Sequence, residues 1–223
     1  MKYKKVVKGE FISRPNRFIA HVNIEGQMHV CHVKNTGRCR ELLVPGATVF
    51  LEESDNPSRK TKYDLIAVYK GNTLINMDSQ APNKVFYEWA TGYFKPDFIK
   101  PEVTYKNSRF DCYLEVGNEK IFAEVKGVTL ENDGVASFPD APTERGIKHL
   151  LELSDAVKNG YTCYVFFIVQ MRGVASFEPN YERHKEFSEA LKLACDNGVK
   201  VMCIDCNVTP DTLTVNDFID VVI

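Results

Sequence analysis

The stretch FAEVKG, Phe122–Gly127, places two opposite charges inside what is otherwise the pattern of a buried strand. Side chains alternate between the two faces of a strand, so Glu124 and Lys126 share one face. The preceding strand-like segment, NSRFDCYLEV, carries Asp111. If these segments pair as a hairpin, Asp111 lies beside Glu124. Two neighbouring carboxylates stay ionised only with a cation between them, and otherwise they share a proton.

These three side chains predict a divalent-metal site. Carboxylate oxygens suit Mg²⁺ or Mn²⁺ better than zinc, and we expect Asp111 and Glu124 to be the ligands. Lys126 would stabilise charge that develops on a phosphate, or help to activate water. The pattern is similar to the D-x(n)-E-x-K motif of the PD-(D/E)xK nucleases, with Phe110 where that name has proline. The triplet alone fits a structural ion pair between Glu124 and Lys126 equally well.

The segments around FAEVKG predict an α/β domain over residues 81–223. A helix over KVFYEWATGYF precedes three strands, VTYK, RFDCYLEV and KIFAEVKGVTL. A second helix is expected to begin after Thr143 as N-cap and to end before Gly160. The strand YTCYVFFIVQ, the helix NYERHKEFSEALKLACDNG and the strand VKVMCIDC follow. The order is α-β-β-β-α-β-α-β, with a mixed central sheet whose last βαβ unit is parallel and right-handed.

The first eighty residues have a different pattern. RFIAHVNI and QMHVCHVK flank the two-residue turn EG, which is typical of a hairpin. GATVFLEE, YDLIAVYK and TLINMDS follow as further short strands, with no convincing helix among them. Five short strands predict a small β-barrel over residues 1–80. The whole chain is then a barrel followed by an α/β domain, α+β overall.

The composition is that of a soluble globular protein, with 223 residues, 44% of them hydrophobic and 26% charged. No run of about 18 apolar residues occurs, so we expect no membrane span. The segment MKYKKVVKGEF lacks the apolar stretch of a signal peptide. The seven cysteines favour reduced, buried thiols in the cytoplasm. Zinc at Cys203 and Cys206, or at the group His29, Cys31, His32 and Cys39, is the less favoured alternative.

Charge is unevenly distributed along the chain. Residues 1–44 hold nine Lys/Arg and three Glu, a balance of +6, so the remainder carries −8 of the net −2. A basic module on an acidic body could form an anion-binding surface at one end. From charge alone, a merely solubilising surface is the preferred interpretation.

Four segments together resemble the sugar fermentation stimulation protein family: NSRFD, AEVKGVTL, FPDAPTERGIKHL and NTGRCREL. The resemblance covers nearly the whole chain. It implies an oligonucleotide-binding (OB) barrel followed by a PD-(D/E)xK-like domain, and a DNA-binding protein with a suggested role in regulating sugar genes. It places Asp111, Glu124 and Lys126 in the nuclease core and Glu88 at the acidic position of the first helix. Periodicity supports Glu88 weakly, since Glu88 lies opposite the face of Phe86, Trp89 and Tyr93.

Polar and basic residues in both halves are candidates for contacts with nucleic acid. On the helix after Thr143, a polar stripe is expected opposite the apolar face formed by Ile147, Leu150, Leu151, Ser154 and Val157. The candidates are Asn35, Thr36, Arg38, Arg40, Arg59, Lys60, Arg145, Lys148 and His149, with Gln170 and Arg172 as weaker ones. Phe18 could stack on a base, but core packing is the preferred interpretation of an aromatic residue there.

Two functions from different classes fit these observations. The favoured one is a DNA-binding protein that hydrolyses phosphodiester bonds with Mg²⁺ or Mn²⁺, with RNA as the alternative substrate. Its rival is a DNA-binding regulator that keeps the nuclease fold without hydrolysis. No membrane partner is expected, and the oligomeric state stays open, with a homodimer as one option.

Overall fold

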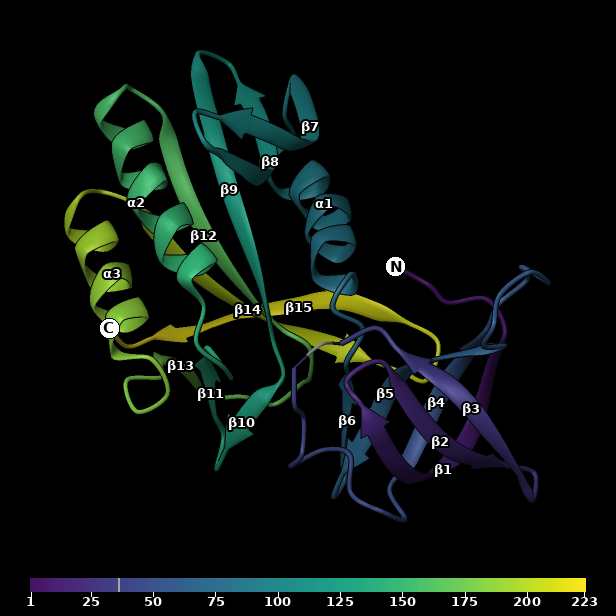
Figure 1. Ribbon diagram of the computed structural model, residues 1–223. Coiled ribbons are helices and arrows are strands. Elements are labelled where there is room, and N and C mark those ends of the chain that lie inside the picture. The colour runs from purple at the N-terminus through teal and green to yellow at the C-terminus, as the bar shows by residue number, and fades with distance from the viewer. Residues whose placement is uncertain (36) are drawn as a thin grey trace.

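The structure is a computed structural model that describes residues 1–35 and 37–223. Two sheets organise it, and Figure 1 shows the smaller one, built from the first strands of the chain, beside the larger one. The strands of the smaller sheet are β1 (Val6–Asn16), β2 (Ile19–Ile24), β3 (Gln27–Val33), β4 (Thr48–Glu53), β5 (Tyr63–Lys70) and β6 (Thr73–Asn76). Their order is β3-β2-β1-β4-β5-β6, and a parallel β3–β5 pairing closes the first five into a barrel. The predicted N-terminal barrel is confirmed.

The membership of the barrel differs from the prediction in one strand. The sequence indicated no strand at β1, and it placed TLINMDS in the ring, whereas β6 lies outside the closed five strands. In β1 only Phe11 is buried, and the neighbouring charges hide the usual alternation. Gly9 marks a close approach, since a Cβ there would lie 2.5 Å from Val22 Cγ1. A strand with one buried side chain gives almost no periodic signal.

The second part of the chain is a nine-stranded mixed sheet with three helices. The helices are α1 (Ala81–Phe94), α2 (Glu144–Lys158) and α3 (Lys185–Asp196). The strands are β7 (Phe98–Tyr105), β8 (Ser108–Val116), β9 (Glu119–Val128), β10 (Leu130–Asn132), β11 (Val135–Phe138), β12 (Thr162–Val169), β13 (Ser176–Pro179), β14 (Lys200–Val208) and β15 (Leu213–Val221). Their order is β10-β11-β13-β15-β14-β12-β9-β8-β7.

Every predicted element of this domain is present. β12 is parallel to β9 and to β14, as expected for a covered central sheet. The strands β10, β11, β13 and β15 were not predicted. The first three have only three or four residues each, and β15 is rich in acidic residues. They extend the sheet on its β14 side, away from β9.

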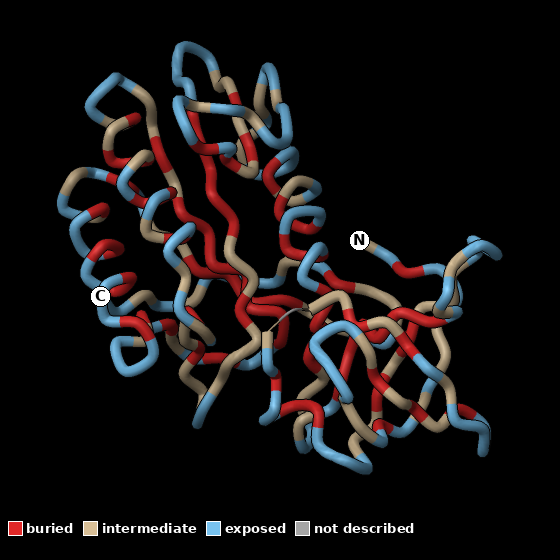
Figure 2. Tube along the Cα trace, viewed as in Figure 1, coloured by how far each residue is buried: buried red, intermediate tan, exposed pale blue. Residues whose placement is uncertain are grey.

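The helices cover the two faces of the large sheet. In Figure 1, α2 and α3 lie on one side of the sheet and α1 on the other. Two buried apolar clusters correspond to these faces, and Phe166 and Phe167, adjacent in β12, belong to different ones. Figure 2 shows that the central strands are mostly buried, whereas buried and exposed positions alternate along the helices. Cys203 and Cys206 also belong to opposite clusters, as expected for positions three apart in a strand.

The seven cysteines are free, and six of them are buried. Burial raises the pKa of the Cys31 thiol, like that of Cys163, to about 12. Such thiols remain protonated at neutral pH and pack as small apolar groups.

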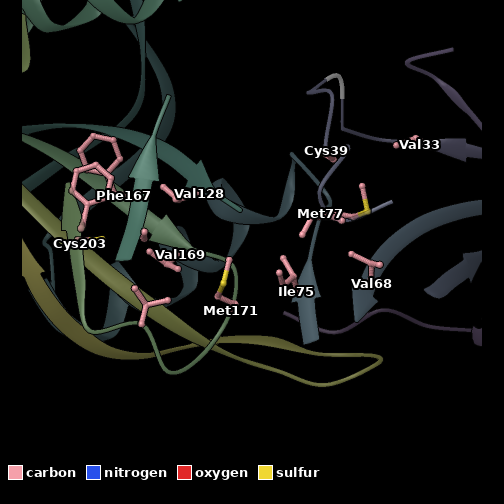
Figure 3. Close-up of a cluster of buried hydrophobic side chains, with 14 of the residues drawn as sticks. Val33, Cys39, Val68, Ile75, Met77, Val128, Phe167, Val169, Met171 and Cys203 are labelled. Atoms are coloured by element: carbon pink, nitrogen blue, oxygen red, sulfur yellow. The ribbon is translucent and has the colours of Figure 1, made fainter. Parts of the chain in front are cut away.

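The barrel and the second domain share a buried interface. Figure 3 shows Ile75 and Met77, at the end of the barrel sheet, facing Val169 and Met171 at the end of β12. The Gln170 amide donates to Asn76 Oδ1 at 2.9 Å and to the Asp78 carbonyl at 3.1 Å. The continuous apolar cluster fixes the barrel against the ends of the central strands β9 and β12. No helix in the described part of the chain is long and apolar enough to cross a membrane.

Helix α2 has the predicted ends but a different buried face. The Thr143 hydroxyl accepts from the Gly146 N–H at 3.1 Å, and Gly160, just past the end, has φ +86°. Leu151, predicted to be buried, is 48% exposed, whereas His149, predicted to be exposed, is only 4% exposed. Because α2 packs against both the sheet and α3, its buried stripe is turned toward His149.

Candidate active site

Asp111 lies where β8 separates from β9. The β8–β9 ladder ends at the Cys112–Ala123 pair, and beyond it the Asp111 Oδ2 accepts a hydrogen bond from the Val125 N–H at 2.8 Å. Phe110 contacts Phe122 on the α2 face, whereas Cys112 packs on the α1 face. A regular strand would place these two alternate residues on one face, so β8 twists at Asp111. The twist brings the carboxylate to the backbone of the E-x-K segment.

Glu124 is held from two sides. Its Oε1 lies 2.5 Å from Lys126 Nζ and 2.5 Å from His149 Nδ1, which reaches it from α2. Its side chain is 3% exposed, and the buried Oε2 has no hydrogen-bond partner within the described residues. Burial alone would raise the pKa of Glu124, but Lys126 and His149 lower it below its ordinary value. Glu124 is therefore a fixed carboxylate with one free oxygen.

The Asp111 carboxylate is influenced by the charge of Glu124. Burial, with the nearby charge of Glu124, raises the pKa of Asp111. Its Oδ1 accepts from Asn83 Nδ2 at 2.8 Å, at the start of α1. The structure thus brings together the three residues that the sequence grouped, Asp111, Glu124 and Lys126, and adds Asn83 and His149.

This arrangement fits a divalent cation. Within residues 1–35 and 37–223 no group of three or more His, Cys, Asp or Glu side chains is arranged around a common point as a metal site. Mg²⁺ needs no such cage, since it keeps several waters and is commonly bound by one or two carboxylates plus substrate phosphates. Asp111 accepts from the Val125 N–H, one residue beyond Glu124, and Glu124 Oε2 has no hydrogen-bond partner among the described residues, so both carboxylates have the chemistry that such an ion requires.

Glu88 lies at the rim and not in this group. Its Oε2 is 2.7 Å from the Met1 ammonium, and its side chain is 60% exposed. It lines the same pocket of about 360 Å³ as Asp111 and Asn83, on the α1 face of the sheet. The structure therefore does not join Glu88 to Glu124.

The polar stripe predicted on α2 is only partly a surface. His149 is buried against Glu124, which corrects its prediction as an exposed contact. Arg145 Nε lies 3.4 Å from His149 Nε2, and Lys148 Nζ donates to the Asn107 carbonyl at 2.6 Å. Arg145 and Lys148 remain exposed, so only these two stay available to a polyanion.

In the barrel, Arg14 organises the NTGRCR loop. Its guanidinium donates to four carbonyls, those of Arg17 (2.8 Å), Asn35 (2.6 Å), Gly37 (2.8 Å) and Arg38 (2.7 Å). Thr36, predicted to contact nucleic acid, lies outside the described residues. The loop reaches the second domain, because a Cβ on Gly37 would lie 2.5 Å from Asp140 Oδ2.

The other barrel candidates divide into two groups. Arg38 and Arg40 are exposed and line a groove of about 600 Å³. Arg59 makes two contacts with Asp64, at 2.8 and 2.5 Å, so its guanidinium is already used, whereas Lys60 is exposed. Phe18 is 50% exposed, so the prediction of core packing is wrong. The weaker candidate Gln170 is buried at the domain interface.

Family models match both parts of the chain. The model described as "SfsA N-terminal OB domain" matches residues 12–77, and the one described as "Sugar fermentation stimulation protein RE domain" matches residues 80–212. The chain belongs to the sugar fermentation stimulation protein family. The resemblance drawn from NSRFD, AEVKGVTL, FPDAPTERGIKHL and NTGRCREL is confirmed.

Relatives in this family match end to end. The chain is 58% identical over 100% of both chains to a sugar fermentation stimulation protein homolog of Clostridium beijerinckii. It is 61% identical to a homolog of Desulfitobacterium hafniense, over 99% of this chain and 98% of the relative. A solved structure of Pyrococcus furiosus SfsA in complex with Ca²⁺ aligns with TM-score 0.88 and 25% identity, over 100% of this chain and 98% of that one.

Three contacts of this family member were missed by sequence reasoning. Asn83 directly precedes the predicted helix KVFYEWATGYF, and nothing in the local sequence links it to Asp111. Arg14 was counted only as charge, although it sits in the same basic N-terminal segment as the loop it binds. One signal could have indicated His149: it lies near the start of the helix that follows the E-x-K strand. Helical periodicity, however, assigned it to the solvent-exposed face.

Proposed function

We propose that this protein binds nucleic acid and hydrolyses phosphodiester bonds with Mg²⁺ or Mn²⁺. The observation that carries the proposal is that Asp111 is held by the Val125 N–H, next to Glu124, whose buried Oε2 has no partner among the described residues. The solved structure of Pyrococcus furiosus SfsA is a complex with Ca²⁺, a cation that also prefers oxygen ligands, which supports the proposal that this chain binds a divalent cation.

Each side chain has a distinct role in this proposal. Asp111 and Glu124 would hold the ion, which polarises a phosphate oxygen and lowers the pKa of a bound water. The Asn83 amide and the Val125 N–H fix the Asp111 carboxylate, so it needs little reorganisation when the substrate binds. Lys126, with 16% of its side chain exposed, can turn from Glu124 toward a phosphate in which charge develops. His149 holds Glu124 in place while Lys126 is engaged.

The nucleic acid would be bound mainly by the basic loops. Arg38 and Arg40 on the barrel and Arg145 and Lys148 on α2 are exposed and can contact phosphates. These contacts carry no base information, so binding should be weakly dependent on sequence. DNA is the proposed ligand, with RNA as the alternative.

A specific observation supports the rival function, a DNA-binding regulator without hydrolysis. The Glu124–Lys126 ion pair is complete and is buttressed by His149, as a purely structural pair would be. In that case Glu124, Lys126 and His149 only tie β9 to α2, and the barrel alone carries the function.

One experiment separates the two functions. Purified protein is incubated with end-labelled single- and double-stranded DNA and with RNA, in Mg²⁺, Mn²⁺ or EDTA. Hydrolysis should occur only with the metals and should be lost in Asp111→Asn and Glu124→Gln. A matched control is Glu119→Gln, an exposed carboxylate at the start of the same strand, which should keep full activity. Activity that survives in Asp111→Asn and Glu124→Gln would come from a contaminant and would leave the regulator as the better description.

A further inference from the structure

The groove on the barrel is rich in arginine. Arg14, Arg17, Arg38 and Arg40 line it, and no acidic residue is among its described lining residues. Four arginines and no carboxylate line one groove of a chain whose net charge is −2. Such a concentration of one sign attracts a polyanion locally although the body is acidic.

Three of these arginines are free to act. The Arg14 guanidinium donates to four loop carbonyls. Arg17, Arg38 and Arg40 are exposed, and within the described residues none of them forms an ion pair. Arg14 therefore holds the loop in shape, and the other three arginines supply the positive charge that is available to a ligand.

An aromatic surface accompanies the charge. Phe18 is 50% exposed, and the Arg17 guanidinium lies 5.9 Å from its ring centroid. A base can stack on such a ring only when it is not stacked inside a duplex. Phosphate-binding arginines beside an exposed aromatic ring are the combination used to bind single strands without sequence preference.

The groove adjoins a cleft that touches the E-x-K strand. A second, smaller cleft of about 180 Å³ between the domains shares Gly37 with the groove and is lined by Asn35, Ser79, Asp140 and Gln170. The cleft is also lined by Gly127, the residue after Lys126 in the E-x-K strand. Ala141 lines the groove and Asp140 lines the cleft, so the two hollows adjoin on the second domain as well.

We infer that the groove and the cleft form one track for a single strand of nucleic acid, which runs from Arg17 and Phe18 across Gly37 to Gly127. The phosphates lie against Arg17, Arg38 and Arg40, and a base stacks on Phe18. The cleft is too small for a duplex. This inference rests on the proposed function for what happens at the end of the track, but the binding itself requires no metal and no hydrolysis.

The test measures binding in EDTA, by fluorescence anisotropy, with labelled single-stranded DNA and RNA of about 20 nucleotides and with the matching DNA duplex. The track variant is Arg17→Ala/Arg38→Ala/Arg40→Ala. The control variant is Lys100→Ala/Lys120→Ala/Lys192→Ala, which removes the same charge from exposed positions on the second domain. The wild type should bind either single strand about tenfold or more tighter than the duplex. The track variant should lose about 10²-fold and flatten the slope of log K against log[salt] by about 2, while the control keeps most of its affinity.

Two further measurements address the stacking and the path. Phe18→Ala should weaken single-strand binding by about tenfold and leave duplex binding unchanged. Photocrosslinking with a thiothymidine oligonucleotide should label both the Phe18 region and residues 127–130. Equal losses of affinity in the two triple variants, or tighter binding of the duplex than of the single strand, would overturn the track. Crosslinks confined to the barrel would show that the strand does not continue through the cleft to Gly127. If hydrolysis fails but these results hold, the proposed enzyme is wrong and the track stands.

Discussion

His149 Nδ1 lies 2.5 Å from Glu124 Oε1, beneath α2 and out of contact with solvent. The two residues are 25 positions apart in the sequence. Their contact ties α2 to the middle of the E-x-K strand. Since Lys126 approaches the same oxygen, Glu124 Oε2 is left as the only free acceptor of this carboxylate among the described contacts. His149 and Lys126 thus occupy one oxygen of Glu124 and leave the other for the proposed cation.

Replacing His149 should therefore affect both stability and metal binding. His149→Ala removes a hydrogen bond to a buried charge and should lower the free energy of unfolding by about 1.5–3 kcal/mol. His149→Asn keeps a donor near the Nδ1 position and should recover part of that loss. Urea unfolding measures the stability, and calorimetry with Mn²⁺ measures the affinity. Leu151→Ala, on the exposed side of the same helix, is the control.

The pH dependence of stability gives a second readout for this contact. The folded-state pKa of Glu124 is lowered, so its contribution is present above the unfolded-state pKa and is lost as the pH falls through the folded value. His149→Ala should shrink that contribution, so its stability deficit should narrow at acid pH. A deficit that is constant from neutral to acid pH would mean that His149 acts only by packing.

Asp111 makes metal binding depend on pH in a predictable direction. Its pKa is raised by burial and by Glu124, so a proton persists on it to higher pH than on an ordinary aspartate, whose pKa is about 3.9. A cation needs the ionised form, and Mn²⁺ affinity should therefore rise with pH through the raised pKa, with release of a proton. Calorimetry in two buffers of different ionisation enthalpy measures that release.

The matched variant for this prediction is Asp111→Asn, which keeps the shape and removes the proton. It should bind Mn²⁺ about tenfold or more weakly, with no proton release. Equal affinities in the wild type and the variant would place the cation elsewhere, or nowhere.

Lys126 is expected to act on rate and not on binding. Lys126→Ala should lower the turnover of phosphodiester hydrolysis by about 10²-fold or more, because the ammonium stabilises charge that develops only in the transition state. Affinity for nucleic acid, measured in EDTA, should change little. Lys120→Ala, six residues earlier and exposed, should leave turnover unchanged. Unchanged turnover in Lys126→Ala would reduce the E-x-K lysine to a structural partner of Glu124.

The sequence predicted the barrel, the element order of the second domain and the grouping of Asp111 with Glu124, because strand alternation and hairpin order are local properties. It could not reveal β1, whose single buried side chain, Phe11, leaves no period to detect. It placed His149 in solvent because a helical wheel cannot say how far α3 turns the buried stripe of α2. Asn83 meets Asp111 only through the fold, 28 residues away, and no spacing rule encodes that contact.

Arg14 illustrates the same limit and carries the last prediction. Sequence alone counts it as one more positive charge, whereas its guanidinium binds four carbonyls of the loop that presents Arg38. Arg14→Ala should destabilise the protein by about 1–2 kcal/mol, since four carbonyls, two of them in partly buried contacts, lose a charged donor. It should weaken single-strand binding while leaving the slope of log K against log[salt] unchanged, because Arg14 neutralises no phosphate.

Two comparisons make this prediction specific. Arg14→Lys keeps the charge but not the planar fork, so it should resemble Arg14→Ala in stability and in affinity. Arg38→Ala should do the reverse, with little effect on unfolding in urea and a slope flatter by about 0.7, the value expected for one lost phosphate contact on a single strand. If Arg14→Lys behaves like the wild type and Arg14→Ala flattens the slope as Arg38→Ala does, then Arg14 contacts phosphate directly. The loop would in that case owe its shape to Asn35, whose Oδ1 accepts from the Gly37 N–H at 2.8 Å.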